Sequence, residues 1–105
     1  MAVVGFIGTG NMGSALARAA AKSDQIDRLL LANRSPEKAQ RLAAELGGEA
    51  VDNRSAAAQA DVLFLAVKPQ YLLEMFSGIR DVLTARTAIH SITGLPDSLI
   101  SPVGT

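Results

Sequence analysis

The 105-residue chain has no cysteine and no tryptophan, a single histidine, and aromatic residues at only 4% of its positions. The absence of cysteine excludes a disulfide framework, a thiolate nucleophile and any Cys-ligated metal. One histidine is too few for a His-rich site, so we predict no metal. Ten basic residues balance ten acidic ones, and this zero net charge gives no bulk attraction to nucleic acid or to an anionic membrane. A small local anion-binding site is still compatible with it.

Long hydrophobic runs are also missing. The N-terminus has no basic segment and its apolar run stops at Gly8, so it does not resemble a signal peptide. No stretch approaches the roughly 20 apolar residues that span a bilayer. We therefore expect a cytoplasmic protein that contacts no membrane.

What the chain does have is a globular composition. Hydrophobic residues make up 49% of it and charged residues 19%, which argues against disorder. A chain of this length is enough for one domain with a real core.

Apolar runs and helix-forming segments alternate along the chain. Strands are predicted over residues 3–7, 28–32, 49–51, 62–67 and 87–92, and helices over 14–22, 36–46, a short segment near 56–58, and 70–83. This alternation predicts an α/β fold: a Rossmann-like, doubly wound parallel sheet of strand order 3-2-1-4-5 in a three-layer αβα arrangement. The ligand crevice of such a sheet lies at the carboxyl ends of its first and fourth strands, so residues 8–13 and 66–69 should face each other across it.

Helical spacing predicts which side chains reach the core. The predicted buried faces are Leu16, Ala19 and Ala20 in the first helix, Ala39, Leu42, Ala43 and Leu46 in the second, and Leu72, Leu73, Phe76, Ile79 and Leu83 in the last. On the last helix, Tyr71 and Met75 are also predicted to be core residues.

A glycine motif follows the first strand. Gly8, Gly10 and Gly13 form G-x-G-x-x-G between a strand and a helix, the context in which the motif indicates dinucleotide binding. Gly8 allows a tight turn, Gly10 lets a pyrophosphate approach the backbone, and Gly13 lets the helix pack close to the strand. Free N–H groups at the helix start would then meet the phosphates. The alternative is a glycine-rich turn that binds nothing.

The end of the second strand selects the cofactor. An Asp or Glu there would bind the ribose 2′-OH of NAD, whereas this chain has Asn33-Arg34-Ser35 and no carboxylate. Arg34 suits a phosphate and can also stack on adenine, and Asn33 and Ser35 can donate hydrogen bonds. We therefore predict NADP, with NADPH preferred over NADH. Ser35 before Pro36 also suits a helix N-cap, and both roles can hold together.

Other polar positions leave alternatives open. Asn53 either reaches the adenosine ribose or, like Ser55, caps a short helix. Lys68 either pairs with phosphates or a substrate carboxylate, or is simply solvated. Pro69 shapes its loop and can pack on a ribose or nicotinamide. His90 is expected to be structural unless it reaches the crevice, and no residue is identified as catalytic.

Three segments in series resemble pyrroline-5-carboxylate reductase. They are residues 5–13, Ala32-Asn33-Arg34-Ser35-Pro36, and residues 61–70, which end in Ala-Val-Lys-Pro-Gln. The resemblance covers about residues 3–94. It implies reduction of 1-pyrroline-5-carboxylate, a small-molecule imine, to L-proline with NAD(P)H, the last step of proline biosynthesis.

The resemblance also implies a cofactor site. It places the pyrophosphate at the glycine turn, Ser35 at the 2′-phosphate, Asn53 at the adenosine ribose, and residues 66–69 beside the ribose and nicotinamide. Residues 91–93 would lie near the nicotinamide, although the family usually has a small residue where Ile92 stands. Together with the residues chosen above, the predicted cofactor-binding set is Ile7, Gly8, Thr9, Gly10, Asn11, Met12, Gly13, Asn33, Arg34, Ser35, Asn53, Ala66, Val67, Lys68, Pro69, Ser91, Ile92 and Thr93.

Members of this family are much longer, with a helical domain that makes the homodimer and supplies most of the imine site. We expect residues 1–94 to form the dinucleotide-binding domain, residues 95–105 an irregular tail, and the helical domain to be absent. Such a chain would bind NADPH but be weakly active or inactive alone. The alternatives are another NADP-dependent reductase, such as a β-hydroxyacid dehydrogenase-like domain, and a non-catalytic nucleotide-binding or interaction module.

Overall fold

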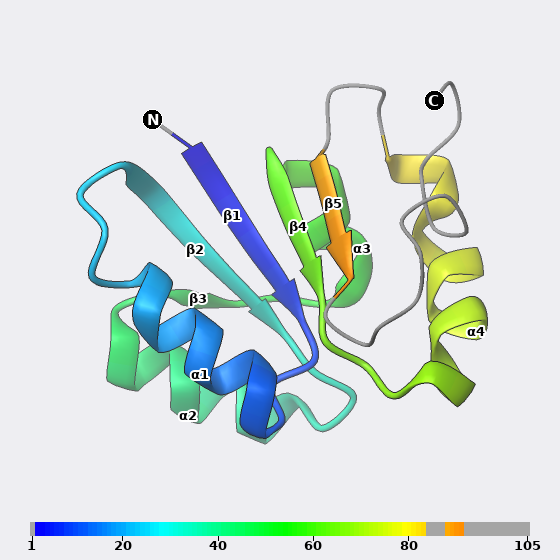
Figure 1. Ribbon diagram of the computed structural model, residues 1–105, viewed down its shortest axis with the longest axis horizontal. Coiled ribbons are helices and arrows are strands. Elements are labelled where there is room, and N and C mark those ends of the chain that lie inside the picture. The colour runs from blue at the N-terminus through cyan, green and yellow to red at the C-terminus, as the bar shows by residue number, and fades with distance from the viewer. Residues whose placement is uncertain (1, 84–87, 92–105) are drawn as a thin grey trace.

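The computed structural model describes residues 2–83 and 88–91. Strands and helices alternate along it (Figure 1), in the order β1 (Ala2–Ile7), α1 (Asn11–Ala20), β2 (Ile26–Ala32), α2 (Pro36–Leu46), β3 (Glu49–Ala50), α3 (Asn53–Gln59), β4 (Val62–Leu65), α4 (Pro69–Ile79), a 3-10 turn (Arg80–Val82) and β5 (Ala88–Ser91). The predicted tail at 95–105 lies outside the described residues.

The five strands form one sheet of order β3-β2-β1-β4-β5, as predicted. All four neighbouring pairs are parallel. β1 is the central strand, and it pairs with β2 on one side and β4 on the other. Because helices cover both faces of the sheet, the inner strands are apolar almost throughout.

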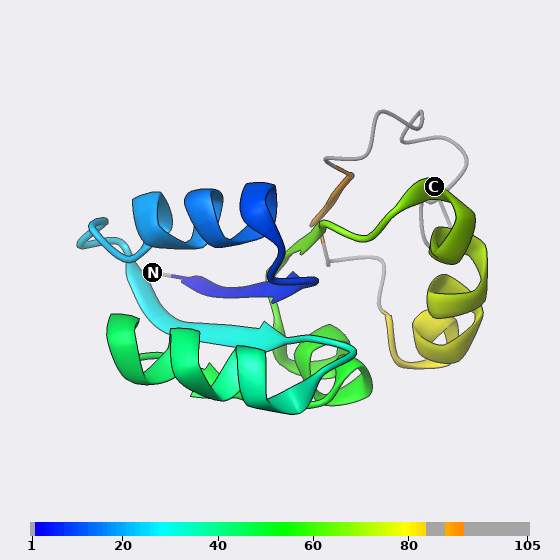
Figure 2. The same cartoon turned by 90° about the horizontal axis from the view of Figure 1, so that it is seen from below.

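Helices lie on both faces, which confirms the three-layer arrangement. α1 and α2 pack on one face of the sheet and α3 and α4 on the other. Figure 2 shows α1 and α4 at opposite sides of the molecule, with strands between them. The core divides the same way. On the first side Phe6 and Leu31 pack with Ala17 of α1 and Leu42 of α2. The other side gathers Ile7, Leu30, Leu63 and Leu65 with Ala56 of α3 and Leu72 of α4.

The ends of α2 follow the prediction. Ser35 is the N-cap, Pro36 the first helical residue, and Gly47 the left-handed C-cap. Three of the four residues predicted on the buried face, Ala39, Leu42 and Ala43, are buried, and Leu46 is half-buried. These signals were reliable because Pro and Gly act through backbone geometry rather than through packing.

The cap of α3 differs from the prediction. Neither Asn53 nor Ser55 is the N-cap. That position belongs to Asp52, whose side chain accepts a hydrogen bond from the Ser55 backbone N–H at 2.7 Å. This contact holds the pKa of the Asp52 carboxyl below its usual value, since the N–H group stabilises the charged form. Asn53 is therefore the first residue of the helix.

The buried face of α1 also differs. Ala17 is fully buried and Gly13 packs against the preceding turn, whereas Leu16 keeps 36% of its surface exposed. Ala19 is exposed and Ala20 is half-buried. α1 lies so close to the sheet at Gly13 that only small side chains fit beneath it, which leaves Leu16 outside the core.

On α4 the prediction is right for Leu72 and Ile79, which are buried, and wrong for two of their neighbours. Leu73 is 66% exposed and Tyr71 is 43% exposed. The helix also stops at Ile79 rather than continuing to residue 83, and a 3-10 turn follows.

None of the helices in the described part of the chain has the length and apolar character needed to cross a membrane.

Candidate functional site

The carboxyl ends of β1, β2 and β4 meet at one edge of the sheet, the lower edge in Figure 1. Backbone hydrogen bonds extend the ladder into the loops that follow. Gly8 N–H donates to the Ala32 carbonyl at 2.8 Å, and Ala66 N–H donates to the Ile7 carbonyl at 2.8 Å. The turn after β1 is therefore held between the loops after β2 and β4. We call the space next to these three loops, at the carboxyl edge of the sheet, the crevice.

The three glycines of the motif have different structural environments. Gly8 has a φ of +98°, and a Cβ on it would lie 2.5 Å from the Ala66 carbonyl oxygen. A Cβ on Gly13 would collide with the Gly8 carbonyl oxygen. A Cβ on Gly10 would meet nothing within 4 Å. Backbone conformation and packing thus require glycine at positions 8 and 13. Packing does not explain the glycine at position 10, because a Cβ would fit there.

α1 begins directly after Gly10, so its first backbone N–H groups point out of the helix end without intrahelical partners. No side chain caps this end. Thr9 is buried, and its hydroxyl has no hydrogen-bond partner. The Ser14 hydroxyl donates to the Thr9 carbonyl at 2.7 Å and fixes the turn. These first N–H groups make the start of α1 suited to an anion. The side chains of Asn11 and Met12 are not among those the structure describes.

Asn33 links two loops rather than standing free. Its Oδ1 accepts a hydrogen bond from Thr9 N–H at 3.0 Å, and its Nδ2 donates to the Ser35 carbonyl at 3.1 Å. The predicted hydrogen-bonding capacity of Asn33 is thus used largely inside the protein. Ser35 differs: it occupies the N-cap position of α2, yet its hydroxyl makes no capping hydrogen bond.

A cavity of about 650 Å³ fills the crevice. Its wall brings together three of the predicted segments: the glycine turn, the loop after β2 and the loop after β4. The residues that line it include Ile7, Gly8, Gly10, Asn33, Arg34, Ser35, Lys38, Asn53, Ala66, Val67, Lys68, Tyr71, Glu74 and Met75. The expectation that the glycine turn faces residues 66–69 is therefore correct.

Positive charge gathers on this wall. Arg34 comes from the loop after β2, Lys38 from the first turn of α2 and Lys68 from the N-cap of α4. Glu74 is the one acidic side chain among the lining residues. None of the three cations takes part in an ion pair within the described residues. The Arg34 guanidinium instead lies 4.9 Å from the centre of the Tyr71 ring.

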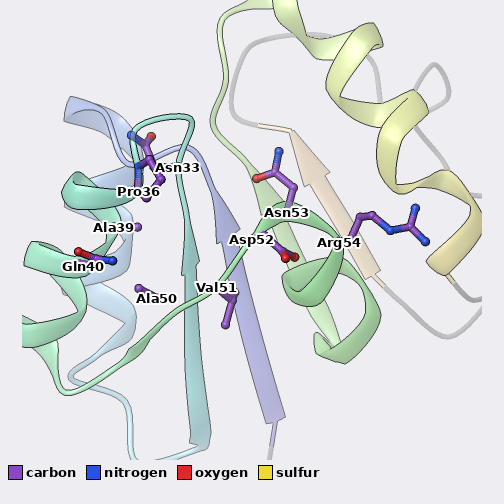
Figure 3. A pocket seen from close by; sticks show the side chains of 9 residues that line it. All are labelled: Asn33, Pro36, Ala39, Gln40, Ala50, Val51, Asp52, Asn53 and Arg54. Carbon is purple, nitrogen blue, oxygen red and sulfur yellow. The ribbon is translucent and has the colours of Figure 1, made fainter.

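A second cavity, of about 600 Å³, adjoins the first and shares Asn33 and Asn53 with it. Figure 3 shows Asn33 on the α2 side, Asn53 at the start of α3, and Arg54 directed away toward α4. Arg54 forms a bidentate ion pair with Asp81, at 2.7 and 2.9 Å. That pair raises the pKa of Arg54 and lowers the pKa of Asp81. The ion pair thus links the start of α3 to the 3-10 turn that follows α4.

The remaining predicted residues are placed in part. Pro69 is the first residue of α4, which supports its predicted role in shaping the loop. Ser91 is the last residue of β5, in register with Leu65, and His90 lies in the same strand. Ile92 and Thr93, together with the side chains of Pro69, His90 and Ser91, lie outside what the structure describes.

The sequence-based reading of the site missed Lys38 and Tyr71. Lys38 was predictable, because Ser35-Pro36 begins a helix whose first turn faces the crevice and Lys38 belongs to that turn. Tyr71 was not, because its spacing from Met75 is equally typical of a buried helix face. Only the tertiary arrangement brings it opposite Arg34.

Comparison with known proteins agrees with the fold and the motifs. Pyrroline-5-carboxylate reductase of Escherichia coli (strain K12) is 34% identical over 92 residues, which are 85% of this chain and 34% of that protein. The chain thus spans about a third of the length of the curated relatives it matches.

Solved structures give the same result. The structure of pyrroline-5-carboxylate reductase from Coxiella burnetii superposes with a TM-score of 0.75 at 30% identity, over 94% of this chain and 38% of that one. That of Plasmodium falciparum pyrroline carboxylate reductase with NADP bound gives 0.71 at 27% identity, over 87% and 33%. A family model described as "NADP oxidoreductase coenzyme F420-dependent" matches residues 3–93, and the chain belongs to that family.

Proposed function

We propose that this chain binds NADP(H) in the crevice and forms the cofactor-binding part of an oxidoreductase of the pyrroline-5-carboxylate reductase type. One observation carries the proposal: a single cavity joins an open glycine position at a helix N-terminus to Arg34, in the loop after β2, and Lys38, in the first turn of α2. Neither cation forms an ion pair within the part of the chain that the structure describes. A dinucleotide that carries a 2′-phosphate needs both features in this relative position.

The pyrophosphate would lie over Gly10, where backbone N–H groups of α1 are free and no Cβ intervenes. The 2′-phosphate would contact Arg34, Lys38 and the hydroxyl of Ser35, which makes no capping hydrogen bond to α2. Asn53 lines both cavities and would reach the adenosine ribose. The volume of each cavity is in the range usual for small-molecule sites.

Ala66, Val67, Lys68 and Pro69 would border the ribose and nicotinamide, with residues 91–93 at the far end of this wall. The cofactor supplies a hydride, and for a reductase of this type the acceptor is the imine carbon of 1-pyrroline-5-carboxylate. The contribution of this chain is to bind and orient the dinucleotide. Imine recognition and assembly into a homo-oligomer, in a cytoplasmic setting, belong to the whole protein in this proposal.

Calorimetric titration of the chain with NADPH and with NADH tests the proposal. We expect NADPH to bind more tightly. In Gly10→Val the new Cβ meets no protein atom within 4 Å, and the side chain occupies the place of the pyrophosphate, so both dinucleotides should bind at least about tenfold more weakly. The melting temperature should fall only modestly, because valine is a poorer N-cap than glycine. Ala19→Val, an exposed change on the same helix, is the control and should bind like the wild type.

If the folded wild-type chain binds neither dinucleotide, the proposal is wrong, and a non-catalytic interaction module becomes the better description. If it binds both but Gly10→Val binds equally well, the cofactor lies elsewhere on the molecule.

A further inference from the structure

The Arg34–Tyr71 contact joins two separate parts of the crevice. Arg34 lies in the loop after β2, and Tyr71 lies in the first turn of α4, after β4. The guanidinium carbon is 4.9 Å from the ring centroid, within the range of a cation–π interaction. Both residues line the cavity that also contains Gly10, Ser35 and Lys38.

A cation–π contact uses the face of the guanidinium and leaves its edges free. The five N–H donors of arginine lie in the plane of the group, so stacking on a ring does not consume them. In the described structure no hydrogen bond or ion pair engages the Arg34 donors. Tyr71 can therefore fix the orientation of Arg34 while every donor stays available to a phosphate.

The orientation of the guanidinium matters because an arginine on a loop loses considerable side-chain entropy when two of its N–H groups bind an anion together. Holding the side chain in place beforehand reduces that cost. Tyr71 is well suited to this task, since α4 is a regular helix and Pro69 fixes its first turn. Neither Ser35 nor Lys38 offers an aromatic or acidic surface for the guanidinium.

We infer that Tyr71 is a positioning residue that holds Arg34 ready for the 2′-phosphate, and so contributes to the choice of NADP over NAD without contacting that phosphate itself. This inference rests on the proposed function. It gives the exposed ring of Tyr71 a role that a core residue would not have, and it assigns α4 a part in cofactor specificity that is usually set by the end of β2 alone.

Two ligands separate this role from direct stacking on adenine. Adenosine 2′,5′-bisphosphate and adenosine 5′-monophosphate share the base and differ in the 2′-phosphate. We expect Tyr71→Leu to lower the affinity for the bisphosphate about three- to tenfold and the affinity for the monophosphate less than about twofold. Tyr71→Phe keeps an aromatic face and should restore wild-type binding. In an Arg34→Ala background, Tyr71→Leu should cause no further loss.

Equal weakening of both ligands would overturn the inference in favour of adenine stacking, and no weakening of either would overturn it outright. Leu73→Ala, an exposed apolar change on the same helix, controls for general effects on α4. A wild-type chain that binds the bisphosphate no better than the monophosphate would contradict the proposed 2′-phosphate site itself, which is a different result from a silent Tyr71→Leu.

The contact can also be tested without any nucleotide. Tyr71 is the only tyrosine of the chain, which has no tryptophan, so its fluorescence reports on this position alone. Removing the guanidinium from the ring in Arg34→Ala should increase quenching by neutral acrylamide, whereas Arg41→Ala on the outer side of α2 should not. Unchanged quenching in Arg34→Ala would show that the two side chains do not stack in solution.

Discussion

The Asn33 side chain accepts a hydrogen bond from the Thr9 backbone N–H at 3.0 Å, across 24 positions of sequence. The same amide donates to the Ser35 carbonyl. This side chain thus joins the glycine turn to the loop that carries Arg34, in addition to the backbone hydrogen bond from Gly8 to Ala32. Because a dinucleotide bridges these two segments in the proposed function, Asn33 helps to set the spacing of its two phosphate sites.

Asn33→Ala should therefore affect both stability and binding. Loss of two partly buried hydrogen bonds should lower the free energy of unfolding by about 1–3 kcal/mol, measured by urea denaturation. Affinity for NADPH and NADH should fall together, since the spacing of the loops matters to both. A stable variant with wild-type affinities would show that the backbone alone holds the loops.

Asn33→Asp is a sharper variant. Its carboxylate can still accept from Thr9 N–H, but its second oxygen would face the Ser35 carbonyl oxygen in place of the Nδ2 donor, so a loss of stability similar to that of Asn33→Ala is expected. The new negative charge at the end of β2 should lower the affinity for NADPH more than the affinity for NADH, because it repels a 2′-phosphate. Titration of both dinucleotides gives the ratio directly.

Arg34→Asp tests the charge at the 2′-phosphate position. Replacing a charge-assisted hydrogen bond by repulsion should weaken NADPH by about ten- to a hundredfold and NADH much less. Arg41→Asp makes the same change of charge on an exposed part of α2 away from the cavity, and should leave the ratio unaltered. Equal losses of NADPH and NADH in Arg34→Asp would remove the argument for a 2′-phosphate site.

Gly13 and Gly78 form a matched pair of helical glycines. A Cβ at Gly13 would collide with the Gly8 carbonyl oxygen, while one at Gly78 would meet nothing within 4 Å. Gly13→Ala should destabilise the fold by about 1–3 kcal/mol through overpacking. Gly78→Ala should stabilise it by about 0.5–1 kcal/mol, because alanine is the better helix former. Thermal denaturation of both variants decides whether close packing at Gly13 is real.

Asp52 gives a prediction for pH. Its pKa is lowered in the folded chain by the hydrogen bond from Ser55 N–H, so its stabilising effect is present above its unfolded pKa of about 3.9 and is lost as pH falls through the folded value. Asp52→Asn keeps a good cap without the charge. The difference between the wild-type and variant melting temperatures should therefore be constant above about pH 5 and shrink or change sign as the pH falls from about 5 to about 2.

The other carboxylates whose pKa is lowered, Glu45, Glu49 and Asp81, each pair with an arginine. Glu45 and Glu49 should titrate equally in wild type and Asp52→Asn. Asp81 pairs with Arg54, which also interacts with Asp52, so the comparison is repeated in an Asp81→Asn background to isolate Asp52. A constant difference across this pH range would mean that the Asp52 carboxylate does not cap α3.

Backbone-driven features of this fold were predictable from sequence. The apolar runs of β1, β2 and β4, the glycine turn, and the Ser35-Pro36 start and Gly47 end of α2 all act through local geometry or continuous burial. Right-handed crossovers restrict the strand order, and the dinucleotide-binding glycine motif after β1 favours the order 3-2-1-4-5 among the doubly wound arrangements. For the site, the positions of the three loops followed from that order, and so did the shared cavity.

Features decided by packing were not predictable. In α1, alanine-rich sequence gives little contrast between faces, and the close approach at Gly13 buries Ala17 instead of Leu16. In α4, Leu73 and Tyr71 have the spacing of core residues but lie at the exposed side. The use of the Asn33 amide within the protein depends on the distance between two loops far apart in sequence, which no local pattern encodes.

The central place of β1 has a consequence for synthesis of the chain. Val4 pairs with Val62, so β1 gains its second neighbour only after more than half of the described chain has been made. Until α3 has been made, α1 and α2 cover only one face of the nascent sheet, and the face bearing Ile7 and Leu30 has no cover. At about 5–20 residues per second, a ribosome leaves this apolar face uncovered for a few seconds, long enough for a chaperone to bind it.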